Sequence, residues 1–210
     1  QSKAHCVAFD VPLTLPKCLR CQLECPGFEV CKEPEITWMW EHYRQRNETK
    51  RPAKLFTPYT ERCTELYISS ELEESFHPSH AFGANLAPLV ARARFLVRRL
   101  QTPVLEVNPK VSLWRIGRSL DIQKSHLRTH RHSLEGENSR RAILERLIAR
   151  DIAFLYVQDV RAMTENNQAF DAFICAITAV LAYKNLTEKR PAKFPDSEAW
   201  TEMPTEKINW

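Results

Sequence analysis

The stretch "AHCVAFD", residues 4–10, is a short and almost continuous apolar run that ends at an aspartate. Such runs are typical of strands buried on both faces, which belong to parallel or mixed sheets. Pro12 and Pro16 follow, and proline interrupts regular structure because it lacks an N–H group and fixes its own φ. The stretch therefore predicts a sheet strand with Asp10 at its carboxyl end.

Apolar runs alternate with helical patterns along the rest of the chain. The runs "TPVLEVNP" (102–109) and "IAFLYV" (152–157) predict two further strands, and residues 63–70 fit either a strand or a helix. Apolar residues at helical spacing predict helices over residues 35–46, 80–101, 139–150 and 164–185. This alternation predicts an α/β fold. No repeat or linker divides the chain, so we expect one domain over 1–210, with 17–34 as a Cys-rich loop within it.

Composition limits the classes of function. The chain has 210 residues, 43% of them apolar, and a net charge of +4, so it can form a core and accept a nucleic-acid partner. It has no apolar run of about 18 residues and no signal peptide, so we expect a cytoplasmic protein with no membrane partner. Four glycines form no phosphate-binding motif. No pattern indicates an oligomeric state.

Three acids lie on three separate predicted elements. Asp10 ends the first strand, Glu106 lies in the second, and Asp171 lies beside the apolar stripe of the helix over 164–185. Sites in open α/β sheets gather at the carboxyl ends of strands. Converging carboxylates bind Mg²⁺ or Mn²⁺, which drive phosphodiester hydrolysis. The alternative is that these acids are unrelated capping and ion-pair residues.

Four of the seven cysteines lie in "PKCLRCQLECPGFEVC", residues 16–31. Thiolates hold Zn²⁺ or an iron–sulfur cluster, and thiols two or three residues apart fold round an ion more easily than they pair as disulfides. The spacing predicts one metal centre, with disulfides or free thiols as the alternative. Its ligands are Cys18, Cys21, Cys25 and Cys31. The other three cysteines, in apolar surroundings, are predicted core residues.

A basic run, "KSHLRTHRH" (124–132), is the best candidate for phosphate contacts. Lys124, Arg128 and Arg131 would make them. The run also fits a solvated loop, and His126 and His130 at helical spacing could bind a metal instead.

Five stretches resemble, in the same order, motifs of the bacterial and archaeal family called domain of unknown function 429, which is predicted to be RNase-H-like and related to nucleases. The resemblance implies an RNase-H-like mixed sheet flanked by helices, with Asp10, Glu106 and Asp171 as candidate metal ligands. It also implies a structural or active-site role for Arg62, which we include among the predicted nucleic-acid contacts. The stretches are "VAFDVPLTLP" (7–16), "YTERCTELY" (59–67), "LEVNPKVSLWRIG" (105–117), "FDAFICAITAVLAYKN" (170–185) and "DSEAWTEMP" (196–204).

The resemblance implies a metal-dependent nuclease that hydrolyses nucleic-acid phosphodiester bonds. Only six residues precede Val7, so the leading strand of such folds, with its acid, is expected to be missing. The alternative function is a non-catalytic nucleic-acid-binding or adaptor protein on the same fold, with the cysteine site as a structural centre.

Overall fold

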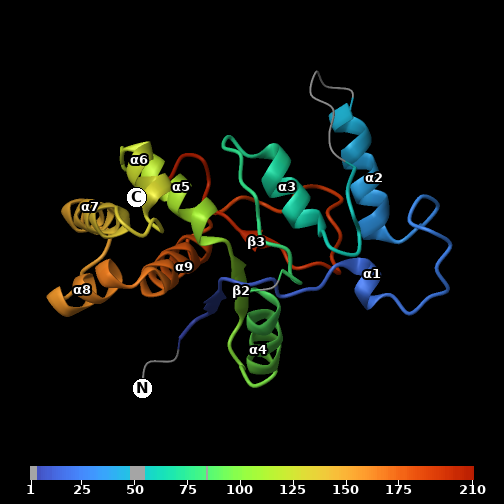
Figure 1. Cartoon of the computed structure of the whole chain (residues 1–210), viewed down its shortest axis with the longest axis horizontal. Helices are drawn as coiled ribbons and strands as arrows, with labels where there is room; N and C mark the ends of the chain where they lie inside the picture. Colours follow the sequence, from blue (N-terminus) through green and yellow to red (C-terminus); the bar gives the residue numbers. More distant parts are fainter. Residues whose placement is uncertain (1–3, 48–54, 84) are drawn as a thin grey trace. The chain divides into compact units, whose positions relative to one another are not determined.

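The computed structural model describes residues 4–47, 55–83 and 85–210 (Figure 1). Within these residues it has nine helices and a small three-stranded parallel sheet, which confirms the predicted α/β class. No helix in this described part is long and apolar enough to cross a membrane. The elements are β1 (Val7–Phe9), α1 (Lys17–Arg20), α2 (Pro34–Asn47), α3 (Cys63–Glu71), α4 (Ala87–Val97), β2 (Val104–Val107), α5 (Pro109–Ser119), α6 (Lys124–Thr129), α7 (Gly136–Ala149), α8 (Val157–Glu165), α9 (Asn167–Tyr183) and β3 (Thr201–Glu202).

The chain forms two compact units. The first unit consists of Gln1–Asp10, Gln101–Glu188 and Glu202–Trp210, and holds β1, β2 and the helices α5 to α9. The second unit consists of Val11–Leu100 and Lys189–Thr201, and holds α1 to α4.

The sheet has the strand order β1-β2-β3. Strands β1 and β2 run parallel, and their register sets Val7 beside Val104 and Phe9 beside Glu106. Both strands fall inside the predicted runs, but β1 is only half-buried and is not covered on both faces as expected. The predicted strand at 152–157 is wrong. The described run forms no strand: its residue Phe154 is 82% exposed, and α8 begins at its last residue.

Helix α9 is the central helix of the first unit. The Asn166 side chain caps it by accepting hydrogen bonds from the backbone N–H groups of Gln168 and Ala169, at 2.8 and 3.2 Å. The helix packs against β1, α5 and α8 (Figure 1). Its buried residues include most of the predicted stripe, but Val180 is 53% exposed and faces away from the core.

A single residue, Asn108, separates the end of β2 from the start of helix α5. The Asn108 side chain caps it, Pro109 occupies its first turn, and most of its residues are buried. A Cβ atom at Gly117 would lie 2.3 Å from Leu127 Cδ2, so a larger residue here would force the Leu127 side chain of α6 to move. Gly117 thus leaves room for Leu127, which α6 packs towards α5, and α6 carries most of the basic run.

The second unit has a core of apolar side chains from α2 and α3. Ile36, Met39, Cys63 and Ile68 are almost fully buried, so Cys63 is a core residue as predicted. Residues 63–70, which fit either class in the sequence, belong to helix α3.

Candidate functional site

The structure brings together two of the three predicted acids in the first unit. Asp10 follows β1, and Asp171 lies near the start of α9. One guanidinium nitrogen of Arg131 lies 2.7 Å from Asp171 Oδ2 and 3.7 Å from Asp10 Oδ2. The two carboxylate oxygens are therefore no further apart than the sum of these distances, well inside the about 10 Å at which two acids can no longer share a two-ion site.

Glu106 lies on the neighbouring strand and is 4% exposed. The parallel register sets it beside Phe9, and successive residues of a strand point to opposite faces. Glu106 therefore shares a sheet face with Phe9, the residue before Asp10. Its part in a metal site stays a prediction.

Arg131 supplies the positive charge that the two carboxylates need. Asp171 is 7% exposed, so it lies in the interior and not on the helix flank that its position in the sequence predicts. Burial raises the pKa of Asp171, although Arg131 opposes this effect. For Asp10, half of whose side chain is exposed, partial burial is also the largest cause and raises the pKa to about 7. Arg131 and Lys110 act against this rise, and Asp171 adds to it.

The imidazole ring of His130 brings a nitrogen atom without a hydrogen-bond partner close to the Asp171 carboxylate. Its Nδ1 lies 2.8 Å from the Leu127 carbonyl oxygen, which can only accept, so Nδ1 carries the proton. Burial lowers the pKa of His130 to about 4, and the ring is therefore neutral near pH 7 with a free lone pair on Nε2. This Nε2 lies 3.8 Å from Asp171 Oδ1, and both atoms are buried without a hydrogen-bond partner. Two facing acceptors of this kind fit a cation or a bridging donor between them.

Arg140 holds His130 in place through the backbone. Its guanidinium donates hydrogen bonds to the His130 carbonyl at 2.5 Å and to the Thr164 carbonyl at 2.6 and 2.8 Å. Arg140 is 5% exposed, and its partners lie 10 and 24 residues away in the sequence. No local pattern signals these contacts, which is why the sequence analysis missed Arg140.

Three cations form a row that we call the basic ridge, made of Lys124, Arg128 and Arg131. Their spacing of four and three residues puts them on one face of α6 and the turn that follows it. Lys124 and Arg128 are exposed, and their charged groups lie 5.7 and 5.4 Å from the centre of the Trp114 ring. The aromatic ring supports both side chains, so the basic run is an organised surface that ends at the carboxylate pair.

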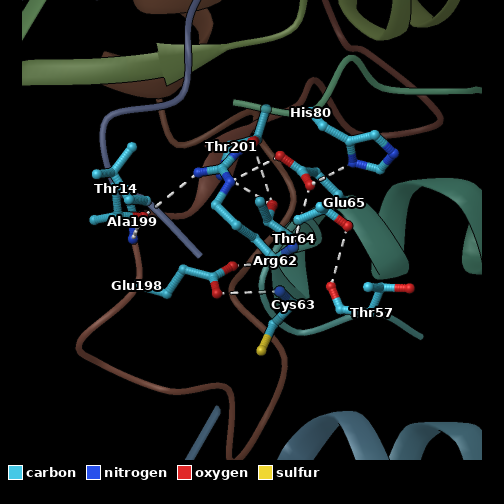
Figure 2. A network of polar contacts seen from close by, with 12 residues as sticks. Thr14, Thr57, Arg62, Cys63, Thr64, Glu65, His80, Glu198, Ala199 and Thr201 are labelled. Carbon is cyan, nitrogen blue, oxygen red and sulfur yellow. Dashed lines mark hydrogen bonds and ion pairs between the residues drawn. The ribbon is translucent and has the colours of Figure 1, made fainter. Parts of the chain in front are cut away.

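Arg62, a predicted nucleic-acid contact, lies instead inside the second unit (Figure 2). It is 2% exposed, its Nε donates to Glu65 Oε1 at 2.9 Å, and its Nη1 lies 3.5 Å from the Thr14 hydroxyl. Beside it, the buried Glu198 carboxylate accepts from the backbone N–H groups of Cys63 and Thr64 at 3.0 and 2.8 Å. This position leaves Arg62 no surface for a phosphate and favours the structural role that the resemblance implied.

All seven cysteines are free thiols. The four predicted metal ligands line one cavity of about 410 Å³ in the second unit. Across residues 4–47, 55–83 and 85–210, no three His, Cys, Asp or Glu side chains are already arranged at metal-binding distances. In the first unit the Arg131 guanidinium bridges the two carboxylates, and in the second unit the thiols surround a cavity without converging.

We expect protonation of Asp10 to make the free energy of unfolding of the metal-free protein depend on pH. The pKa of Asp10 is raised from 3.8 to about 7, so across this range the folded protein keeps a proton that the unfolded chain has lost. The contribution of Asp10 to the free energy of unfolding therefore falls as the pH rises. Asp10→Asn lacks this dependence. The free energy of unfolding of Asp10→Asn minus that of wild type should therefore be larger at about pH 8 than at about pH 5.

Urea unfolding in the presence of a chelator measures this difference. Asp121→Asn is the matched control, since it removes a carboxylate that is 83% exposed in the same unit. A relative stability of Asp10→Asn that does not change with pH would contradict the raised pKa of this half-exposed carboxyl group.

A comparison with protein families matches residues 1–196 to the family described as "Protein of unknown function (DUF429)". The comparisons with curated proteins and with solved structures give no match. The family match covers nearly the whole sequence, including Asp10, Arg131 and Asp171. The chain therefore belongs to the DUF429 family.

Proposed function

We propose that this protein is a metal-dependent nuclease that hydrolyses nucleic-acid phosphodiester bonds on an RNase-H-like fold. One observation carries the proposal. The buried, unpartnered atoms His130 Nε2 and Asp171 Oδ1 face each other at 3.8 Å, next to the Asp10–Asp171 carboxylate pair. The parallel β1–β2 pair with α9 packed on β1 supports the RNase-H-like part, because an acid at a strand end then meets an acid on a helix.

Two of the proposed donors, on His130 and Asp171, are spaced to fit a divalent ion. Two ligands that each lie about 2.1 Å from a metal can be up to about 4.2 Å apart, so the 3.8 Å between His130 and Asp171 allows both to bind one ion. Asp10 would complete the set. A neutral imidazole among carboxylates favours a transition ion over magnesium, so we expect Mn²⁺ to support more activity than Mg²⁺.

The ion would activate a water molecule and offset charge on the phosphate in the transition state. The protein's own residues prepare this chemistry. The His130 Nδ1 bond to Leu127 keeps Nε2 unprotonated, and Arg140 fixes the backbone of His130. Arg131 neutralises the carboxylates without an ion, and its one-third exposed side chain is free to turn to a substrate phosphate once an ion replaces it.

The basic ridge supplies the second part of the proposal, which is nucleic-acid binding. Exposed Lys and Arg side chains bind phosphates without regard to sequence, and the ridge ends at the carboxylates that would hold the ion. A phosphate backbone that follows the ridge would therefore pass the proposed site. The second candidate function, a non-catalytic nucleic-acid-binding protein, uses the same ridge, with Arg131 as a permanent partner of the acids.

Asp171→Asn separates these two functions. The amide has the shape of the carboxylate but ligates a cation poorly, so we expect Mn²⁺-dependent cleavage of labelled DNA or RNA to fall by at least about 100-fold. Circular dichroism and the melting temperature report whether the fold is retained. Asp121→Asn, an exposed carboxylate in the same unit, should cleave like wild type. Equal cleavage by Asp171→Asn and wild type would rule out the proposed site, and binding without cleavage in wild type would favour the second candidate.

Arg131→Gln should change metal and nucleic-acid binding in opposite directions. Without the guanidinium an added ion no longer competes with an internal cation, so calorimetry should show tighter Mn²⁺ binding. Loss of a phosphate contact should weaken nucleic-acid binding. Arg161→Gln serves as the control, since Arg161 is 78% exposed on α8 and pairs with Glu165. Weaker binding of both partners would mean that Arg131 only supports the fold.

The double variant Lys124→Gln, Arg128→Gln tests the rest of the basic ridge. Each phosphate contact that is lost should reduce the slope of log affinity against log salt concentration by about 1, so we expect a reduction of about 2. Fluorescence anisotropy with a labelled oligonucleotide at several salt concentrations measures the slope. An unchanged slope would show that nucleic acid, if bound, lies elsewhere on the protein.

A further inference from the structure

The loop of residues 18–31 in the second unit has the features of a second, independent metal site. Cys18 lies in α1, Cys21 directly follows that helix, and Cys25 and Cys31 lie in the loop that leads to α2. All four thiols are unpaired, and all four line the same cavity of about 410 Å³. The other three cysteines lie outside this cavity's lining.

The base of this loop is held firmly. Lys17 pairs with Glu33, and Arg20 pairs with the fully buried Glu35 at 2.8 Å. Burial alone would raise the pKa of Glu35, but the Ser197 hydroxyl and the two cations outweigh it, so the pKa lies below its ordinary value. The charged Glu35 therefore ties α1 to the start of α2.

The middle of the loop is also anchored. The Trp40 indole N–H donates to the Phe28 carbonyl at 2.9 Å, and the two rings stack with centroids 5.8 Å apart. Gly27 has φ +93°, which only glycine adopts easily, and the Val30 N–H donates to its carbonyl. This turn reverses the chain between Cys25 and Cys31 and returns the fourth thiol towards the first three.

The parts of the loop between these anchors are not stabilised by regular secondary structure or by buried apolar side chains. Residues 21–33 contain no helix or strand, and Leu23 and Val30 are 66% and 63% exposed. A loop of this length without regular structure is uncommon in a compact unit unless it has a function or a ligand that orders it. Four thiols around one cavity provide the chemistry for such a ligand.

We propose that Cys18, Cys21, Cys25 and Cys31 bind one structural Zn²⁺ ion as thiolates. The spacings of two and three residues among the first three cysteines are those of zinc sites. Cys18 and Cys25 are exposed, which suits an ion without redox chemistry. Lys17 and Lys32 line the same cavity together with Glu24 and Glu33, so the lining adds no net charge of its own to that of the thiolates and the ion.

Binding draws the thiols together. They do not lie at ligating distances from one another in the described structure, so the loop closes around the ion as it binds. Each thiol gives its proton to solvent when its sulfur coordinates the ion, and binding is therefore stronger at higher pH. The site orders the surface of the second unit and does not depend on the proposed nuclease activity.

Elemental analysis of the purified full chain tests the proposal. We expect one zinc per chain in a colourless protein. Cys21→Ser and Cys25→Ser should each bind Zn²⁺ at least about 100-fold more weakly in competition with a chromogenic chelator. Cys6→Ser is the matched control, because Cys6 lies outside the cavity, and it should keep the zinc. Asp171→Asn should also keep it, which distinguishes this site from the carboxylate site.

A second measurement covers variants that fold poorly. In wild-type protein, four thiols should react slowly with a thiol reagent until a chelator is added, and limited proteolysis within residues 21–33 should then become faster. Metal-free protein that takes up no added Zn²⁺ would overturn the proposal. So would iron with a brown colour, since it would assign an iron–sulfur cluster to the same cysteines.

Discussion

Two carboxylates that lie far apart in the sequence, Asp10 and Asp171, share one guanidinium in the first unit. Asp10 and Asp171 are both partly or fully removed from water, and like charges at this separation repel, so the arrangement needs a cation between them. Arg131 provides it. Helix α6 must lie close enough to place Arg131, and Gly117 allows that approach. Arg131, which follows α6, thus links residues beside β1 and on α9 through one balance of charge.

The same balance would let the proposed site exchange its internal cation for a metal ion. An arginine held by two carboxylates, with a third of its side chain exposed, can be replaced by an ion without leaving the acids uncompensated. His130 cannot move in the same way, because Arg140 and the Leu127 carbonyl fix it. The proposed site would therefore combine a rigid nitrogen ligand with an exchangeable internal cation, which would suit binding of a metal and a phosphate together.

Local pattern predicted the α/β class, the strand that ends at Asp10 and the helix that carries Asp171. It could not predict His130 as a buried neutral ring, because a histidine within a basic run has the appearance of a solvated residue. Its environment comes from Arg140, whose contact with Thr164 spans 24 residues. The strand expected at 152–157 failed for a related reason, since an apolar run forms a strand only where a neighbour supplies hydrogen bonds. Tertiary contacts also turned Arg62 inward, to Glu65 and away from any phosphate.

The two proposed ions differ in the chemistry of their ligands. Carboxylate oxygens and one imidazole nitrogen would bind the first ion, and four sulfurs would bind the second. Zinc binds N/O sites more tightly than manganese or magnesium does, so the carboxylate site alone would not exclude it. Soft thiolates compete for zinc far better, and a chain that carries both sets directs zinc to its cysteines first.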